Sequence, residues 1–206
     1  MTDLLRLKHK RVTGDKPEYR NEVTMSKAIG MVEYKTVSTG IQAADLMLKT
    51  AEVEIIEAQT VCPGKYIVLI SGDLSAVNAS VEASRVQYGQ QLIDSFVLGN
   101  PHESIFSAIY GAANIEDVKA LGVLETFSAA SIIVAADAAA KTSMVDLIEL
   151  RIARGMCGKS YLMLTGDVAA VTAAIERAQA EVSESGMFLE SSVIPSPDKR
   201  LWDSIL

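Results

Sequence analysis

The sequence is poor in the features by which nucleic-acid-binding, membrane and secreted proteins are recognised. Aromatic residues make up 5% of its 206 residues, which leaves few rings for stacking on bases, and its net charge is −7. No uninterrupted apolar run is long enough to span a bilayer, and the N-terminus lacks the apolar core of a signal peptide. We therefore expect a cytoplasmic protein with neither nucleic acid nor membrane as a partner.

Histidine and cysteine are equally scarce, with two of each. His9 and His102 build no Ser-His-Asp set and no metal cluster of recognisable spacing, so an enzyme is the least expected class of protein. Cys62 and Cys157 lack the CxxC spacing. A structural disulfide between them is not expected in a cytosolic chain.

What the chain does contain is an internal repeat. Residues 28–57 recur at a constant offset of 92, and residues 64–77 recur at an offset of 94. The pairs at the first offset include Gly30–Gly122, Glu33–Glu125, Ala44–Ala136, Asp45–Asp137, Lys49–Lys141 and Thr50–Thr142. We predict two domains, at 26–113 and 114–206, after a basic and flexible N-terminal tail at 1–25. A surface used between two copies in one chain can be reused between chains.

Each copy predicts the element order β-α-β-β-α-β-α. In the first copy we expect strands at 28–34, 53–60, 65–70 and 91–98 and helices at 39–50, 74–88 and 102–110. Pro63 and Gly64 mark a turn between two strands. Asp73 and its counterpart Asp167 are expected to cap the following helices through their side chains. The fold class is α/β (α+β), with a mostly antiparallel sheet and helices on one face.

The repeated pattern of Ala-x-Gly-x-x-Glu, Ala-Ala-Asp, Lys, Gly-Lys and Gly-Asp resembles the bacterial microcompartment shell domain. Two unpermuted copies, covering residues 27–206, resemble the tandem-domain shell proteins that form trimers. Residues 60–65, TVCPGK, are similar to the pore loop of the propanediol-utilisation type. The resemblance implies a homotrimer that mimics a hexamer, has a central pore, and tiles with other shell proteins around encapsulated enzymes.

The same resemblance places the Cys62 turn around the threefold axis. Three thiolates could then bind three irons of a [4Fe–4S] cluster, with a non-protein ligand on the fourth iron; one chain alone has too few thiols. We expect one cluster per trimer, for electron transfer across the shell or iron–sulfur supply, with Cys62 as the metal ligand. Cys157 is expected to pack, and a second ring of thiols at the axis is the alternative. The expected pore lining is Val61, Cys62, Pro63, Gly64, Gly155, Met156, Cys157 and Gly158.

Further residues receive roles at the edge or within the fold. The resemblance makes Lys49 and Lys141 edge lysines, with Asn100 and Ser196 where the family carries an arginine-containing Pro-Arg-Pro-His motif. The missing arginine means that the tiling contacts need not match the family's. Lys65 and Lys159 are expected to flank the pore loop or to bond across a subunit boundary. Glu33 and Glu125 are interpreted as exposed strand acids, and Asp45 and Asp137 as structural helix residues.

Two other functions stay open. The pore could be free of a cluster and conduct metabolites past the same two turns. The chain could instead be a small-ligand-binding or regulatory α/β protein that uses the cleft between its domains, because fold alone does not determine function.

Overall fold

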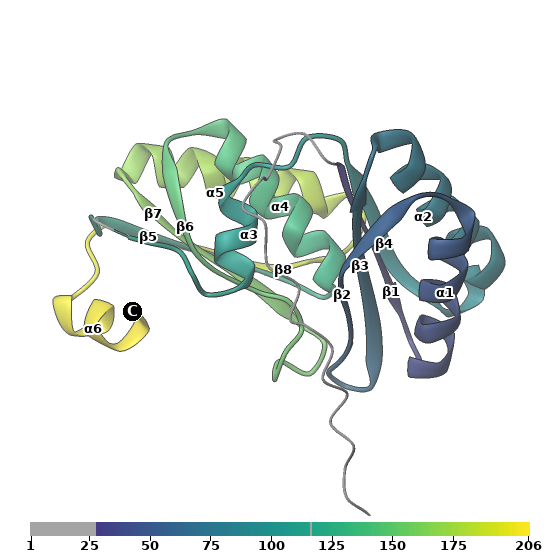
Figure 1. Ribbon diagram of the computed structural model, residues 1–206. Coiled ribbons are helices and arrows are strands. Elements are labelled where there is room, and N and C mark those ends of the chain that lie inside the picture. Colours follow the sequence, from purple (N-terminus) through teal and green to yellow (C-terminus); the bar gives the residue numbers. More distant parts are fainter. Residues whose placement is uncertain (1–27, 116) are drawn as a thin grey trace, which may run out of the picture.

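The computed structural model describes residues 28–115 and 117–206 (Figure 1), so the expected N-terminal tail lies outside the described residues. The chain forms two four-stranded antiparallel sheets with strand orders β2-β3-β1-β4 and β6-β7-β5-β8. The two orders are the same in sequence terms, which confirms the prediction of two unpermuted α/β copies. The domain limits at 26–113 and 114–206 stay predictions.

The first copy contains four strands and three α-helices. Its elements are β1 Ala28–Tyr34, α1 Val37–Thr50, β2 Val53–Val61, β3 Lys65–Gly72, α2 Leu74–Tyr88, β4 Leu92–Leu98 and α3 Ser104–Ile109. The elements of the second copy are β5 Ala120–Thr126, α4 Ala129–Thr142, β6 Val145–Arg151, β7 Ser160–Gly166, α5 Val168–Ser183, β8 Phe188–Ile194 and α6 Lys199–Ile205. The predicted strand at 28–34 is confirmed, and α1 begins two residues before the predicted start of that helix.

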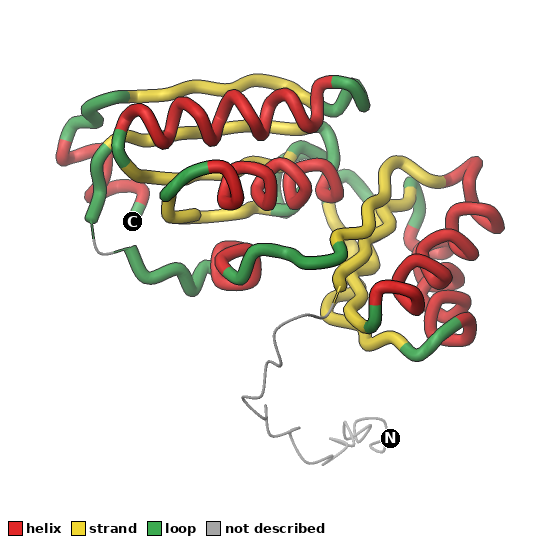
Figure 2. Tube along the Cα trace, turned by 90° about the horizontal axis from the view of Figure 1, so that it is seen from above, coloured by secondary structure: helices red, strands yellow, loops and turns green. Residues whose placement is uncertain are grey.

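Strand β1 is an almost continuous apolar run because both faces of its sheet are covered. Ala28, Val32 and Tyr34 pack on one face with residues of α1 and α2. Ile29 and Met31 point to the other face, where they join the core around α4 of the second domain. The first sheet therefore lies between its own helices and the second domain, as Figure 2 shows. Each fully buried Ile or Met side chain contributes about 1.5–3 kcal/mol.

The repeated glycine of the first strand permits close packing of a helix. A Cβ atom on Gly30 would lie 2.7 Å from Val77 Cγ1 and 2.8 Å from Val81 Cγ2, both on α2. At the matching position, a Cβ on Gly122 would lie 2.9 Å from Val171 Cγ1 on α5. Any side chain here would push the helix away from the sheet, so the glycine is required by packing in both copies.

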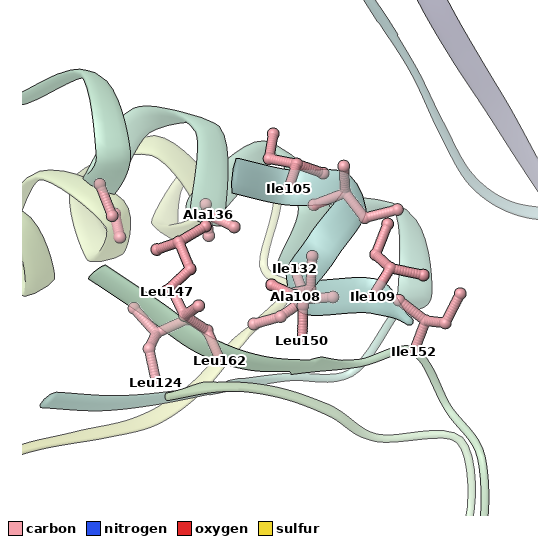
Figure 3. Close-up of a cluster of buried hydrophobic side chains, with 14 of the residues drawn as sticks. Ile105, Ala108, Ile109, Leu124, Ile132, Ala136, Leu147, Leu150, Ile152 and Leu162 are labelled. Atoms are coloured by element: carbon pink, nitrogen blue, oxygen red, sulfur yellow. The ribbon is translucent and has the colours of Figure 1, made fainter. Parts of the chain in front are cut away.

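Helix α3 carries the first copy across onto the second domain. Ile105, Ala108 and Ile109 belong to the same buried cluster as Leu147 and Leu150 of β6 (Figure 3). The matching helix α6 lies at the outer side of the second domain, at the left of Figure 1. There Trp202 is buried in a small cluster with Leu121 and Ile148.

The capping prediction is wrong in its mechanism. Asp73 and Asp167 occupy the N-cap positions of α2 and α5, but their side chains accept no capping hydrogen bond. Their backbone carbonyls instead accept the amides of Val77 and Val171, each at 2.9 Å. The Asp167 carboxylate lies 3.1 Å from Lys119 Nζ. The Asp167 carboxylate therefore pairs with Lys119 and not with the amides at the start of α5.

Candidate pore site

The Cys62 turn forms the tip of the hairpin between β2 and β3. The Gly64 amide donates to the Val61 carbonyl at 3.0 Å and closes the turn. Gly64 has a φ of +96°, a conformation that side chains with a Cβ rarely adopt. Cys62 is half-buried and carries a free thiol. The sequence therefore builds a tight tip that leaves the thiol partly open to solvent.

The corresponding turn of the second copy is longer and more strained. Gly155, Cys157 and Gly158 all have positive φ angles, of 70°, 52° and 88°. For a residue with a Cβ this conformation costs about 1–2 kcal/mol. Cys157 is exposed in the single chain, and its expected packing in the ring stays a prediction. The Lys159 amide closes the turn on the Met156 carbonyl at 3.0 Å.

The two turns adjoin each other. The Cys62 amide donates to the Ala153 carbonyl at 3.1 Å, and Lys65 Nζ lies 3.3 Å from the Gly158 carbonyl oxygen. A Cβ on Gly158 would be 3.2 Å from Pro63 Cδ. The eight residues expected to line a pore therefore belong to two neighbouring turns, at the lower end of both sheets in Figure 1. Their role as a pore lining stays a prediction.

Glu33 is a buried member of the domain interface, so its interpretation as an exposed strand acid is wrong. Its side chain has no exposed surface, and Lys65 Nζ lies 2.8 Å from its Oε1. Its Oε2 accepts the amide of Ala129, the first residue of α4, at 2.8 Å. Burial raises the pKa of Glu33, and the nearby Lys65 ammonium and the Ala129 amide oppose that rise. Glu125, its counterpart, is half-buried.

Lys65 forms hydrogen bonds across the boundary between the two domains of one chain. The expectation had been a hydrogen bond across a boundary between subunits. Besides Glu33, Lys65 approaches the Phe127 carbonyl oxygen of the second domain at 3.4 Å. Asp94 on β4 adds a contact that sequence reasoning missed. Its Oδ2 accepts the hydroxyls of Ser128 and Ser131 at the start of α4. Asp94 faces Glu33 across the β1–β4 pair, so two acids hold the same helix terminus.

Lys141 also joins the two domains. Its Nζ lies 2.6 Å from the Asn100 carbonyl oxygen and 2.6 Å from Asp137 Oδ2. Asp137 is buried, and its Oδ1 accepts the His102 amide at 2.8 Å. In the first copy, Lys49 pairs with Asp45 on an exposed surface at 2.6 Å. The roles of Lys49, Lys141, Asn100 and Ser196 at a shell edge stay predictions.

Metal-ligating side chains do not gather in the described part of the chain. Across residues 28–115 and 117–206, no group of three or more His, Cys, Asp or Glu residues is placed to hold a metal ion. Nor does any helix in the described part of the chain have the length and apolar character needed to cross a membrane.

The comparisons with known proteins identify the family. A model of the BMC domain matches residues 28–101 and 120–197. The bacterial microcompartment shell protein PduT of Citrobacter freundii is 39% identical over 178 residues, which are 86% of this chain and 97% of that protein. The chain belongs to the bacterial microcompartment shell proteins. The carboxysome shell protein CsoS1 of Prochlorococcus marinus is 36% identical over 89 residues, which are 42% of this chain.

Solved structures support the same family. A crystal structure of a microcompartment protein from Desulfitobacterium hafniense has a TM-score of 0.75 and 49% identity, and the match covers 86% of this chain and 98% of that one. The fused permuted hexameric shell protein MSM0275 from the RMM microcompartment has a TM-score of 0.61 at 21% identity, and the match covers 77% and 84% of the two chains. The second likeness shows the fold alone.

Proposed function

We propose that this shell protein assembles as a homotrimer with a central pore, and that the Cys62 turn and the Cys157 turn of each chain surround that pore. The observation that carries the proposal is the direct contact between the two turns, through the Cys62 amide and the Ala153 carbonyl at 3.1 Å. Equivalent loops of two similar domains that adjoin each other are expected close to the axis that relates those domains. Three chains would bring six such turns together.

We also propose that Cys62 of three chains holds one [4Fe–4S] cluster. The residues fit this group because each chain offers one partly exposed thiol at a tight turn. Three symmetric thiolates satisfy three irons, and a non-protein ligand completes the fourth. When bound, the cluster would supply one-electron transfer across the shell. The protein itself would hold Cys62 at the tip of the hairpin. It does so through the hydrogen bond from the Gly64 amide to the Val61 carbonyl and the one from the Cys62 amide to the Ala153 carbonyl.

Anaerobic purification followed by iron, sulfide and native-mass analysis of one sample tests both proposals. We expect a mass of three chains and, per trimer, about four irons and four sulfides. Cys62→Ser should remove the iron and sulfide while the mass stays at three chains, and Cys157→Ser should keep both. A trimer that remains free of iron after anaerobic reconstitution would refute the cluster and favour the metabolite pore.

A ligand-binding or regulatory protein has less support. A pocket of about 710 Å³ lies within the second domain, lined by residues 118–120, 167–168 and 195–197 and by one side of α6 with Trp202. The cleft between the domains is instead filled by buried side chains, including Ile29, Met31 and Ile133. The shell family and this filled interface both favour a structural function.

A further inference from the structure

We infer that Arg154 of the second domain is a positioning residue for Cys62 of the same chain. Paired with Glu57 of the first domain, Arg154 holds the adjacent Ala153 in a left-handed conformation, and the Ala153 carbonyl in turn fixes the Cys62 amide. With Cys62 as the proposed cluster ligand, on which this inference rests, these contacts set where its thiol lies. Arg154 acts through the backbone and not as a ligand.

Ala153 has a backbone conformation that its residue type disfavours. Its φ is +56°, and across residues 28–115 and 117–206 Cys157 is the only other residue with a Cβ and a positive φ. Such a conformation is sparsely populated in a free chain and persists where the surrounding structure determines it. The contacts around Ala153 therefore have to supply that support.

Both backbone groups of Ala153 are engaged. Its amide donates to Ser160 Oγ at 3.0 Å, and its carbonyl accepts the Cys62 amide at 3.1 Å. Ala153 and Ser160 are both fully buried. A rotation of Ala153 into an ordinary helical or extended conformation would redirect its carbonyl, because φ and ψ set the direction of the peptide group. The backbone position of Cys62 therefore depends on the conformation of Ala153.

The greater length of the second turn creates this contact. The offset of the repeat rises from 92 before the turns to 94 after them, so the second turn has two more residues than the first. At the offset of 92, the counterpart of Ala153 is Val61, which still belongs to strand β2. The left-handed residue thus arises from a local difference between the copies and not from the repeat itself.

Arg154 ties the residue after Ala153 to the first domain. Its guanidinium group is paired with Glu57 Oε1 on β2, and Gln59 Nε2 donates to the same oxygen. The Glu57 side chain is only 10% exposed, so its charge is largely removed from water and requires a counter-charge. Arg154 supplies that charge, and the pair fixes the backbone next to Ala153 against the first sheet.

The matching glutamate of the second copy is satisfied differently. Glu149, the counterpart of Glu57, is paired with Arg151, two residues away on its own strand. Its other oxygen accepts the Tyr161 hydroxyl of the neighbouring strand at 2.6 Å. Both oxygens of Glu149 are therefore satisfied within one sheet.

The first copy has neither of these two partners for Glu57. Gln59 and Ile67 stand at the positions that match Arg151 and Tyr161, and they provide no positive charge and no hydroxyl group. Glu57 Oε2 is consequently buried without a hydrogen-bond partner in the described part of the chain. A buried carboxylate depends strongly on its counter-ion, so removal of Arg154 is expected to disturb this end of the turn.

Alkylation of Cys62 measures its position without a cluster. In a Cys157→Ser background of the full chain, Cys62 is the sole thiol, and its reaction with iodoacetamide in the metal-free, anaerobic protein can be followed by mass spectrometry. Arg154→Ala should raise the rate by about tenfold, because the strained conformation of Ala153 loses its support and the turn opens. Glu57→Gln should raise it less.

Arg151→Ala is the matched control for Arg154→Ala. Both arginine side chains are 46% exposed and both are paired with a β-strand glutamate, but Arg151 is paired within its own sheet. The alkylation rate of this control should stay within about twofold of the parent.

The sign of the effect separates positioning from charge. A nearby guanidinium group favours the reactive thiolate, so an Arg154 that acted through its charge alone would give slower alkylation when removed. Glycine adopts the left-handed conformation readily. Ala153→Gly added to Arg154→Ala should therefore reverse most of the increase in rate, which it would not do for a lost charge.

The reconstituted protein gives a second readout. Arg154→Ala should shift the reduction potential of the bound cluster, because hydrogen bonding and solvent exposure around the ligand sulfurs set that potential. Arg151→Ala should leave the potential at the parent value. A parent that takes up no iron would refute the cluster and leave the alkylation rates to decide the role of Arg154.

Two results would overturn the inference whatever the iron content. One is an Arg154→Ala rate equal to or below that of the parent, in a variant that keeps the parent's far-ultraviolet circular dichroism. The other is a raised rate that Ala153→Gly does not reverse. If Arg154→Ala fails to fold, Glu57→Gln decides: a raised rate supports the inference, and an unchanged rate overturns it.

Discussion

Replacement of Glu33 with alanine would remove the central acceptor of the interdomain clamp, the name used here for Glu33, Lys65 and Asp94 at the start of α4. The change leaves Lys65 without its carboxylate and the Ala129 amide without an acceptor, in a place where the Glu33 side chain has no exposed surface. Loss of one partner of a buried pair costs about 3–5 kcal/mol. Glu33→Gln keeps one acceptor oxygen where both Glu33 oxygens accept hydrogen bonds, so we expect a smaller loss of about 1–3 kcal/mol.

Urea unfolding at a protein concentration low enough to disfavour assembly is the assay for these two variants. In a chain of this size, each kcal/mol lost lowers the melting temperature by about 2–4 °C, which gives an independent check. Glu125→Gln is the matched control in the other copy and should change the free energy of unfolding by no more than about 0.5 kcal/mol. Equal effects of Glu33→Gln and Glu125→Gln would refute the assigned clamp.

The pH dependence of the free energy of unfolding shows whether the ionised or the protonated form of Glu33 favours the fold. Burial raises the pKa of Glu33 above its ordinary value of 4.5, so the folded chain holds this proton more tightly than the unfolded chain. The free energy of unfolding then falls as the pH rises from 4.5 through the raised pKa. The difference between the parent and Glu33→Gln should therefore shift in favour of the parent as the pH is lowered through that window. A difference that moves the opposite way would show that Lys65 outweighs burial.

Two further predictions concern single side chains. Gly30→Ala should destabilise the chain by about 1–3 kcal/mol in urea unfolding, because its Cβ would lie 2.7 Å from Val77 Cγ1; Gly89→Ala, where a Cβ meets nothing within 4 Å, is the control and should not destabilise. Burial and a hydrogen bond to Glu149 raise the pKa of Tyr161 to about 12. A spectrophotometric titration should thus show one phenol ionising near pH 12 that Tyr161→Phe removes, and a titration without that step would contradict the contact.

The sequence predicted what depends on local patterns. The strands and helices follow from apolar periodicity and from turn residues such as Pro63 and Gly64, and these act over a few positions. Burial of Glu33 was missed because its partners lie 32 and 96 residues away, at Lys65 and Ala129. The recurrence of a glutamate and a lysine at matched positions in both copies was the available signal. The pair recurs 32 residues apart in the first copy and 34 apart in the second, and the contact forms in the first copy.

The predicted exposure of the strand acids failed for a related reason. An acid on a strand is exposed when one face of the sheet meets water, as in many antiparallel sheets. Here the second face of the first sheet is covered by α4, so Ile29, Met31 and Glu33 are all buried together. Periodicity within one copy does not reveal that the other copy covers it.

The two copies share irregularities of strand pairing at matched positions. Each has a register shift after the first-strand glutamate, between Glu33 and Tyr34 and between Glu125 and Thr126. Each has another shift in its edge strand, between Ile55 and Glu57 and between Leu147 and Glu149. As a result, Glu33 faces Asp94 in the first sheet and Glu125 faces Glu190 at the matching place in the second.

This repetition has a consequence for the form of the assembly. One chain exposes Ile41 of α1 and Ile55 of β2 on its first domain and Leu201 of α6 on its second, so the two domains present different apolar surfaces. Copies of such a chain associate head to tail. The rotation between one chain and the next decides whether the product is a closed ring or a filament. If the rotation that relates neighbouring domains of two chains equals the rotation within one chain, a ring of six domains contains three chains, because each chain supplies two domains. The native mass of the assembly measures that number directly, which makes it the decisive observation for the pore as well.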